Sequence, residues 1–147
     1  MVLLAIAAAL AGVFFGAALY VNVVEHPARV ACGTVVAVQE FRPSYSRAAV
    51  MQGTLAVVGC LVGLAAAWQL RDLHIAINAI LLGLVVPITL VLIRPINNRL
   101  LDPGLDAAGA QAAQLLVRWN RLHGIRTVLG GLAFVLMLFR MVLRGAT

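Results

Sequence analysis

Two histidines, His26 and His123, each lie in a polar cluster at the end of a hydrophobic segment long enough to cross a bilayer. Ionisable groups at membrane depth cost free energy and mark functional sites. An imidazole titrates near neutral pH, so either histidine could transfer a proton as a general base or acid. Two such clusters in a chain of 147 residues predict one site built between helices, with His26 and His123 facing each other.

The His123 cluster forms a stripe on one predicted helix. Trp119, His123 and Arg126 follow one another at the i, i+4, i+7 spacing of a helix face. Asn120 is one position round and can reach the same space. The alternative is an interfacial belt, in which Trp119 and the flanking arginines meet lipid headgroups. The belt fits His123 and Arg126 less well, because they lie further into the apolar run.

The His26 cluster repeats this pattern. Asn22 and His26 are four residues apart and share a helix face, and Glu25 is adjacent. Arg29 lies near the next turn if the helix continues, but Pro27 leaves this open because a residue before proline avoids helical geometry. The alternative is a helix end at which His26 and Glu25 meet headgroups and water.

The composition is that of a membrane protein. The chain is 63% hydrophobic and only 11% charged, with mean hydropathy +1.04, whereas soluble domains are about 25% charged. A pI near 11.1 would suggest nucleic acid in a soluble protein. Here the arginines stand at segment ends, where they anchor to lipid headgroups. We expect the lipid bilayer as partner, no nucleic acid, and a multi-pass protein of the bacterial plasma membrane.

Four apolar segments meet the need for about 20 residues per crossing. The predicted fold class is all-α: one domain over 1–147, an integral membrane four-helix bundle with both termini on one side. The Ala-, Gln- and Leu-rich stretch 105–121 lacks proline and predicts that the fourth helix extends beyond the hydrocarbon. The predicted spans cover residues 2–24, 48–70, 73–93 and 122–143.

Other features shape these spans. The first connection, 25–47, holds an apolar stretch at 30–38 that suits a re-entrant or an interfacial element. Pro87 predicts a kink in the third helix, because it frees the carbonyl of Gly83. Small residues recur every four positions and serve either packing inside the bundle or a homo-oligomer contact. These ridges are Ala8, Gly12 and Gly16 on the first helix, and Gly59, Gly63 and Ala67 on the second.

The crossings bring both clusters to one mouth of the bundle. Three crossings separate the end of the first helix from the start of the fourth, so His26 and His123 arrive at the same depth. Further polar residues arrive at this mouth from the second and third helices: Tyr45, Arg47, Gln52, Arg94, Asn97 and Asn98. The opposite mouth holds fewer: Gln69, Arg71, Asp72, His74, Arg140 and Arg144. This asymmetry predicts a single site.

A metal site is the rival chemistry. His26, Glu25 and His123 would supply two imidazoles and a carboxylate, a set used for zinc or non-haem iron. No HxxxH or ExxH spacing preassembles it, and haem could use only the paired histidines. The sequence has no phosphate loop, GxSxG or CxxC. We therefore expect no cofactor and keep metal binding as an alternative.

Three motifs carry a family resemblance. They are Tyr20 with Glu25-His26-Pro27-Ala28, then Arg94-Pro95-Ile96-Asn97, and above all Trp119-Asn120-x-x-His123-x-x-Arg126-Thr127. With them the chain resembles, over nearly its whole length, the anthrone oxygenase-like family of small four-helix membrane proteins, many of unknown function. The resemblance implies a cofactor-independent oxygenase that converts an activated methylene of a polyketide anthrone to a ketone with O₂.

The same resemblance implies roles for the clusters. His123 or His26 would remove the proton, Arg126 and Asn120 would stabilise the enolate oxygen, and Trp119 would stack on the ring. The partner would be a hydrophobic aromatic small molecule arriving from the bilayer. Residues expected to bind it are Trp119, Glu25, Asn22, Arg29, Asn97 and Tyr45. The alternatives are a non-enzymatic protein that binds a lipid-like ligand or a partner subunit, and a His/Glu metal enzyme.

Arginine counts predict the orientation of the site. The site-bearing mouth carries Arg29, Arg42, Arg47, Arg94, Arg99, Arg118 and Arg121, and the other mouth carries Arg71, Arg140 and Arg144. Because basic residues stay cytoplasmic, we expect the site-bearing mouth in the cytoplasm. Reporter enzymes fused into the 94–121 connection should be active only in their cytoplasmic form; activity of a periplasmic reporter there would reverse the orientation.

Overall fold

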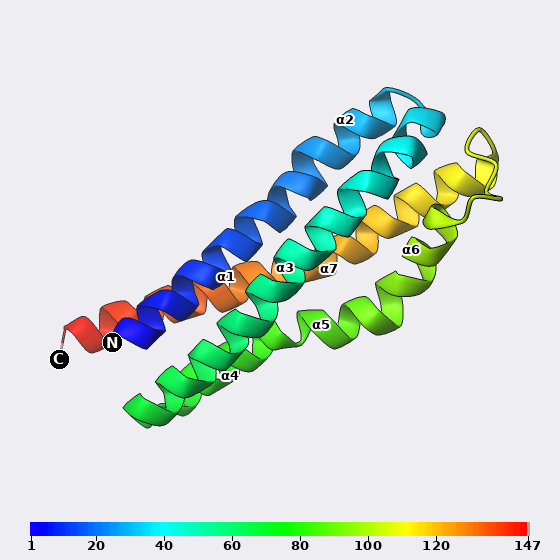
Figure 1. The fold of residues 1–147 in the computed structure, drawn as a ribbon. Coiled ribbons are helices and arrows are strands. Elements are labelled where there is room, and N and C mark those ends of the chain that lie inside the picture. The colour runs from blue at the N-terminus through cyan, green and yellow to red at the C-terminus, as the bar shows by residue number, and fades with distance from the viewer. Residues whose placement is uncertain (147) are drawn as a thin grey trace.

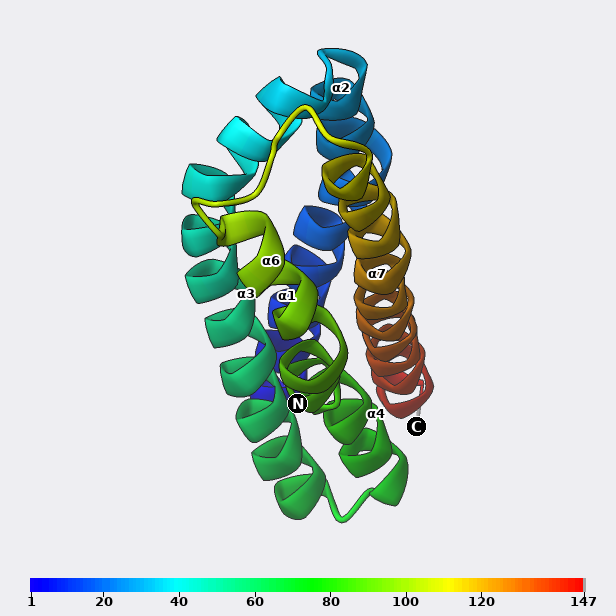
Figure 2. The same cartoon turned by 90° about the vertical axis from the view of Figure 1, so that its right-hand side faces the viewer.

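A computed structural model describes residues 1–146, which form four long helical segments and no strand (Figure 1). Each segment is long and apolar enough to cross a membrane, which confirms the all-α, multi-pass integral membrane fold. The segments are Val2–Ala31, Thr34–Leu70, Leu73–Leu101 and Ala110–Gly145. In both views (Figures 1 and 2) the termini lie at the end of the α3–α4 turn, opposite α2 and the α6–α7 connection.

Two of the four segments are composite. The first contains α1 (Val2–Tyr20), the π-helix η1 (Val21–Glu25) and α2 (His26–Ala31). The third contains α4 (Leu73–Gly83), α5 (Val85–Ile88), η2 (Thr89–Ile93) and α6 (Arg94–Leu101), with η2 again a π-helix. The second and fourth are single helices, α3 (Thr34–Leu70) and α7 (Ala110–Gly145).

The prolines explain the π-helices. Both π-helices have five residues and end two positions before a proline, η1 before Pro27 and η2 before Pro95. A proline ring removes the hydrogen-bond donor for the carbonyl four residues earlier and clashes with that carbonyl. The carbonyls concerned belong to Val23 and Val91, in the middle of η1 and η2. The wider π-turn accommodates each ring without ending the helix.

The expected first connection is helical instead. Only Cys32 and Gly33 separate α2 from α3, and Gly33 has a φ of 98°, which favours glycine. The stretch 30–38 contains the end of α2, the turn at Cys32 and Gly33, and the start of α3. The helices continue because Ala37, Val38 and Phe41 bury against the cluster around Trp119, which outweighs the proline penalties. The helix also continues through Pro27, since His26 adopts helical angles.

The rest of the chain agrees more closely with the predictions made from the sequence. The third segment is interrupted at Leu84, next to the Gly83 carbonyl that Pro87 leaves without a donor, and it changes direction there (Figure 1). The fourth helix begins at Ala110 and extends beyond the apolar run as expected. Residues 105–109, which were expected to be helical, form turns in which the Asp106 carboxylate accepts from the Ala108 amide at 3.0 Å.

The small residues of the α3 ridge pack against α4 of the same chain. A Cβ added to Gly59 would lie 2.7 Å from Leu82, and one added to Gly63 would lie 2.7 Å from Ala79. Glycine is thus required for the close approach of α3 and α4. On α1, Ala8 is buried but Gly16 faces open space. A homo-oligomer through these ridges stays a prediction.

An ion cluster around Asp72 closes the end of the bundle away from His26 and His123. The buried Asp72 carboxylate accepts from the His74 amide at 3.0 Å, pairs with Arg140, and lies 3.1 Å from Arg144. Burial alone would raise the pKa of Asp72. The hydrogen bond and charge of Arg140, with the amides of His74 and Ile75, outweigh burial and hold this pKa below its ordinary value of 3.8.

We predict that Asp72→Asn lowers the melting temperature of the purified protein. Asparagine keeps the acceptor for His74 but removes the charge that faces Arg140, and each kcal/mol lost corresponds to about 2–4 °C. A carboxyl with a depressed folded pKa stabilises above its unfolded pKa and loses this effect as pH falls through the folded pKa. The deficit should therefore be full at pH 7 and vanish well below pH 3.8. Asp106→Asn, at an exposed turn, is the control; equal melting of wild type and Asp72→Asn at pH 7 would contradict the prediction.

Candidate functional site

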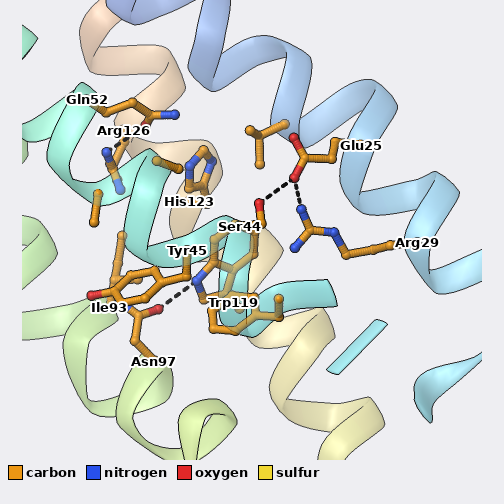
Figure 3. A pocket seen from close by; sticks show the side chains of 14 residues that line it. Glu25, Arg29, Ser44, Tyr45, Gln52, Ile93, Asn97, Trp119, His123 and Arg126 are labelled. Carbon is orange, nitrogen blue, oxygen red and sulfur yellow. Dashed lines mark hydrogen bonds and ion pairs between the residues drawn. The ribbon is translucent and has the colours of Figure 1, made fainter. Parts of the chain in front are cut away.

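Side chains from all four membrane segments line one small cavity (Figure 3). Its volume is about 30 Å³, which is room for one or two water molecules. Seven of the residues expected at the site line it: Glu25, Arg29, Tyr45, Asn97, Trp119, His123 and Arg126. The remaining lining residues are Val21, Phe41, Ser44, Ala48, Ala49, Gln52 and Ile93. The expected candidates Asn22, His26 and Asn120 are not part of this wall.

Asn22 holds His123 from behind the cavity. Its side-chain nitrogen donates to the Asn120 backbone carbonyl at 3.0 Å and to the Asn120 side-chain oxygen at 2.7 Å. A backbone carbonyl can only accept, so this contact fixes which end of the Asn22 amide is nitrogen. The Asn22 oxygen then faces His123 Nδ1 at 2.9 Å and also accepts from the Thr127 hydroxyl.

This network assigns the proton on the His123 ring. Because the Asn22 oxygen cannot donate, His123 Nδ1 must carry the hydrogen. In the neutral ring the other nitrogen, Nε2, then keeps its lone pair. His123 is only 2% exposed and lines the cavity. Asn22 thus orients a buried imidazole whose other nitrogen has the lone pair that accepting a proton requires.

Trp119 connects the two histidines. Its indole stacks with His123 at 4.7 Å and with His26 at 5.4 Å between ring centroids. The indole N–H donates to Asn97 Oδ1 at 2.7 Å, and Phe41 packs edge-on against the ring at 5.3 Å. The prediction that His26 and His123 face each other is therefore wrong: each ring stacks on the Trp119 indole, and His26 is not part of the cavity wall.

Arg126 supplies a buried cation beside His123. Its guanidinium donates to Gln52 Oε1 at 2.8 Å and lies over the Phe14 ring at 5.7 Å, a cation–π contact. Arg126 is 8% exposed, and its Nε has no hydrogen-bond partner among the described residues. A buried donor without a partner is costly, so Arg126 is suited to bind an oxygen of a ligand.

Two carboxylates balance Arg29 at the outer side of the cavity. Arg29 pairs with Glu25 one turn away, and its Nε lies 2.8 Å from Glu40. Ser44 donates to the Glu25 carboxylate at 2.9 Å. The expected substrate-binding residues Glu25 and Arg29 are thus engaged with each other, and Figure 3 shows the contacts of Glu25 with Arg29 and Ser44.

Three residues of the site and its surroundings are not among the candidates predicted from the sequence: Gln52, Glu40 and Ser44. Gln52 carried a signal, since it is a lone amide inside an apolar run, and it is only 2% exposed. Glu40 and Ser44 carried none, because they fell in the stretch taken for a connection. Their position in α3 depends on that helix beginning as early as Thr34.

The residues of the metal alternative do not converge. Within residues 1–146, no three His, Cys, Asp or Glu side chains gather closely enough to hold a metal ion. Glu25 is bound by Arg29 and Ser44, whereas His123 is bound by Asn22. A zinc or iron site at His26, Glu25 and His123 would need these contacts to break.

Fold and site together define a small four-helix integral membrane protein with a histidine–tryptophan–arginine cavity. A model of the anthrone oxygenase family matches residues 41–136, and the chain belongs to this family. The match contains Tyr45, Gln52, Asn97, His123 and Arg126. No curated protein and no solved structure matches the chain.

We predict that the neutral His123 ring is protonated at Nδ1 and unprotonated at Nε2. Nitrogen-15 NMR of the histidine-labelled protein at pH 8 should show this tautomer for the signal that disappears in His123→Gln. Asn22→Leu removes the acceptor, so the preference should disappear there. A His123 signal protonated at Nε2 in the wild type would contradict the assigned network.

Proposed function

We propose that this protein is a membrane-embedded oxygenase that oxidises an activated methylene of a hydrophobic aromatic substrate with O₂, without a cofactor. Membership of the anthrone oxygenase family supports this reading. The observation that carries it is the His123 ring, whose Nδ1 is engaged by Asn22 and which lines one cavity together with Arg126; within residues 1–146 Nε2 has no hydrogen-bond partner. We further propose the bacterial plasma membrane as its location.

The proposed reaction is R₂CH₂ + O₂ → R₂C=O + H₂O. His123 Nε2 removes one methylene proton, and the electron pair moves into the conjugated ring carbonyl to form an enolate. The Arg126 guanidinium, which lines the cavity, donates a hydrogen bond to the enolate oxygen and stabilises the negative charge in a low-dielectric site. The substrate itself supplies the electrons that reduce O₂.

Oxygen insertion and water loss complete the balance. The carbanion carbon bonds to O₂, and the terminal oxygen takes the proton from His123 to give a hydroperoxide. His123 then removes the second proton from the same carbon, the C=O bond forms, and the O–O bond breaks. The departing hydroxide takes that proton and leaves as water, so both methylene protons and one oxygen atom are accounted for.

The neighbouring residues have supporting roles in this proposal. Trp119 offers an aromatic wall to the substrate and is held by Asn97 and backed by His26. Asn120 orients Asn22, and Asn22 orients His123. We therefore expect His26→Ala to weaken substrate binding, whereas His123→Ala removes the base.

We predict that His123→Gln lowers the rate of anthrone oxidation by about 10²–10⁴-fold, the usual contribution of a positioned base. Arg126→Gln should lower it by roughly 10²-fold or more, as loss of one oxyanion donor does. The assay follows O₂ uptake and anthraquinone absorbance with reconstituted protein, after subtraction of the protein-free rate.

His74→Gln is the matched control and should retain full activity, because His74 is an exposed histidine at the opposite end. Wild-type rates in His123→Gln would refute the assigned base. Tight anthrone binding with no turnover in the wild type would instead favour the non-enzymatic alternative, a protein that binds a lipid-like ligand.

A further inference from the structure

A second, larger cavity opens between α3 and the α5–η2 part of the third segment. Its volume is about 190 Å³, and apart from Thr89 its polar lining residues are Tyr45, Gln52 and Arg126. The Thr89 hydroxyl donates to the Val85 carbonyl at 2.6 Å, so it needs no water or ligand. Leu90 at its rim is exposed on the side of the bundle. At this depth in the spans, the exposed side faces lipid.

The two cavities share a wall. Tyr45, Ala49, Gln52 and Arg126 line both of them. The Arg126 guanidinium, whose Nε lacks a partner among residues 1–146, is therefore next to both the polar cavity of His123 and the apolar cavity at the bundle surface. A ligand in the larger cavity that carries an oxygen would lie against the Arg126 guanidinium, because this residue lines the cavity.

Gly53 and the irregular third segment create this space. A Cβ added to Gly53 would meet nothing within 4 Å. On the other side, Val85 and Val86 follow the helix interruption at Leu84, and Thr89 is the first residue of the π-helix η2. The hollow is thus part of the helix geometry and is lined mainly by aliphatic atoms.

The volume fits aromatic carbon. An apolar protein cavity of about 150 Å³ is enough to hold benzene, so 190 Å³ receives at least one ring, and the open side lets further rings extend into the bilayer. The cavity of His123, at about 30 Å³, has room only for O₂, water or one reacting carbon. By size, the larger cavity suits ring binding and the smaller cavity suits the reacting carbon.

We propose that the α3–α5/η2 cavity is the ring-binding subsite, which takes a fused aromatic ketone from the lipid and sets its carbonyl at Arg126. Gly53 is then a specificity-determining residue, because any side chain there occupies the ring position. The proposal rests on the proposed oxygenase function for its ligand class. It is tested by binding, which does not depend on turnover.

The test measures equilibrium binding of 9,10-anthraquinone to the full chain in lipid nanodiscs, with empty nanodiscs as the blank. Gly53→Leu should raise Kd about ten-fold or more, the usual effect of extra methylenes in a ligand pocket, and Gly53→Ala should lie between. Gly16→Leu is the matched control, because Gly16 is also a membrane-helix glycine with nothing within 4 Å of an added Cβ. His123→Gln should bind like wild type.

Each outcome either supports or overturns the ring-binding subsite. Weaker binding only in the Gly53 variants supports the subsite, even if the wild type oxidises no anthrone and the proposed function fails. Absent binding in the wild type, or wild-type Kd in Gly53→Leu, overturns the subsite, even if turnover is retained. If Gly53→Leu does not fold, a wild-type Kd in Gly53→Ala overturns it and a raised Kd supports it.

Discussion

The hydrogen bonds of Asn22 are the constraint on which the rest of the site depends. One amide joins the first segment to the fourth by donating to Asn120 and accepting from His123 and Thr127. Inside a membrane no water replaces a lost partner, so an unpaired amide or imidazole is expensive. The network therefore fixes helix register and ring tautomer together, and the free nitrogen of His123 is a consequence of how the bundle is held.

Proline placement gives this network its geometry. Asn22 lies inside η1, the π-turn that precedes Pro27, and the corresponding turn η2 precedes Pro95. Just beyond η2, Asn97 reaches the Trp119 indole at 2.7 Å. π-Turns recur at functional sites because they rotate side chains without ending a helix. Here two of them bring amides from separate segments to the same face of α7.

The sequence was sufficient for the topology but not for the local geometry. Crossing number alone brings Glu25 to the depth of His123, and both line one cavity. The sequence could not show that the predicted connection 25–47 is helical. Proline rules describe local conformation, whereas the burial of Phe41 that stabilises this helix is a tertiary contact. The sequence also could not show that Asn22 orients His123 whereas Arg126 lines both cavities. That difference depends on which atoms already have hydrogen-bond partners.

In the proposed reaction His123, oriented by Asn22, is the base that removes a proton from the substrate carbon. The most direct measurement is hydrogen–deuterium exchange at the anthrone methylene in D₂O without O₂, which isolates proton removal from oxidation. We expect wild-type protein to accelerate exchange above the protein-free rate, His123→Gln to lose this acceleration, and Asn22→Leu to lose most of it. Equal exchange by wild type and His123→Gln would contradict the account.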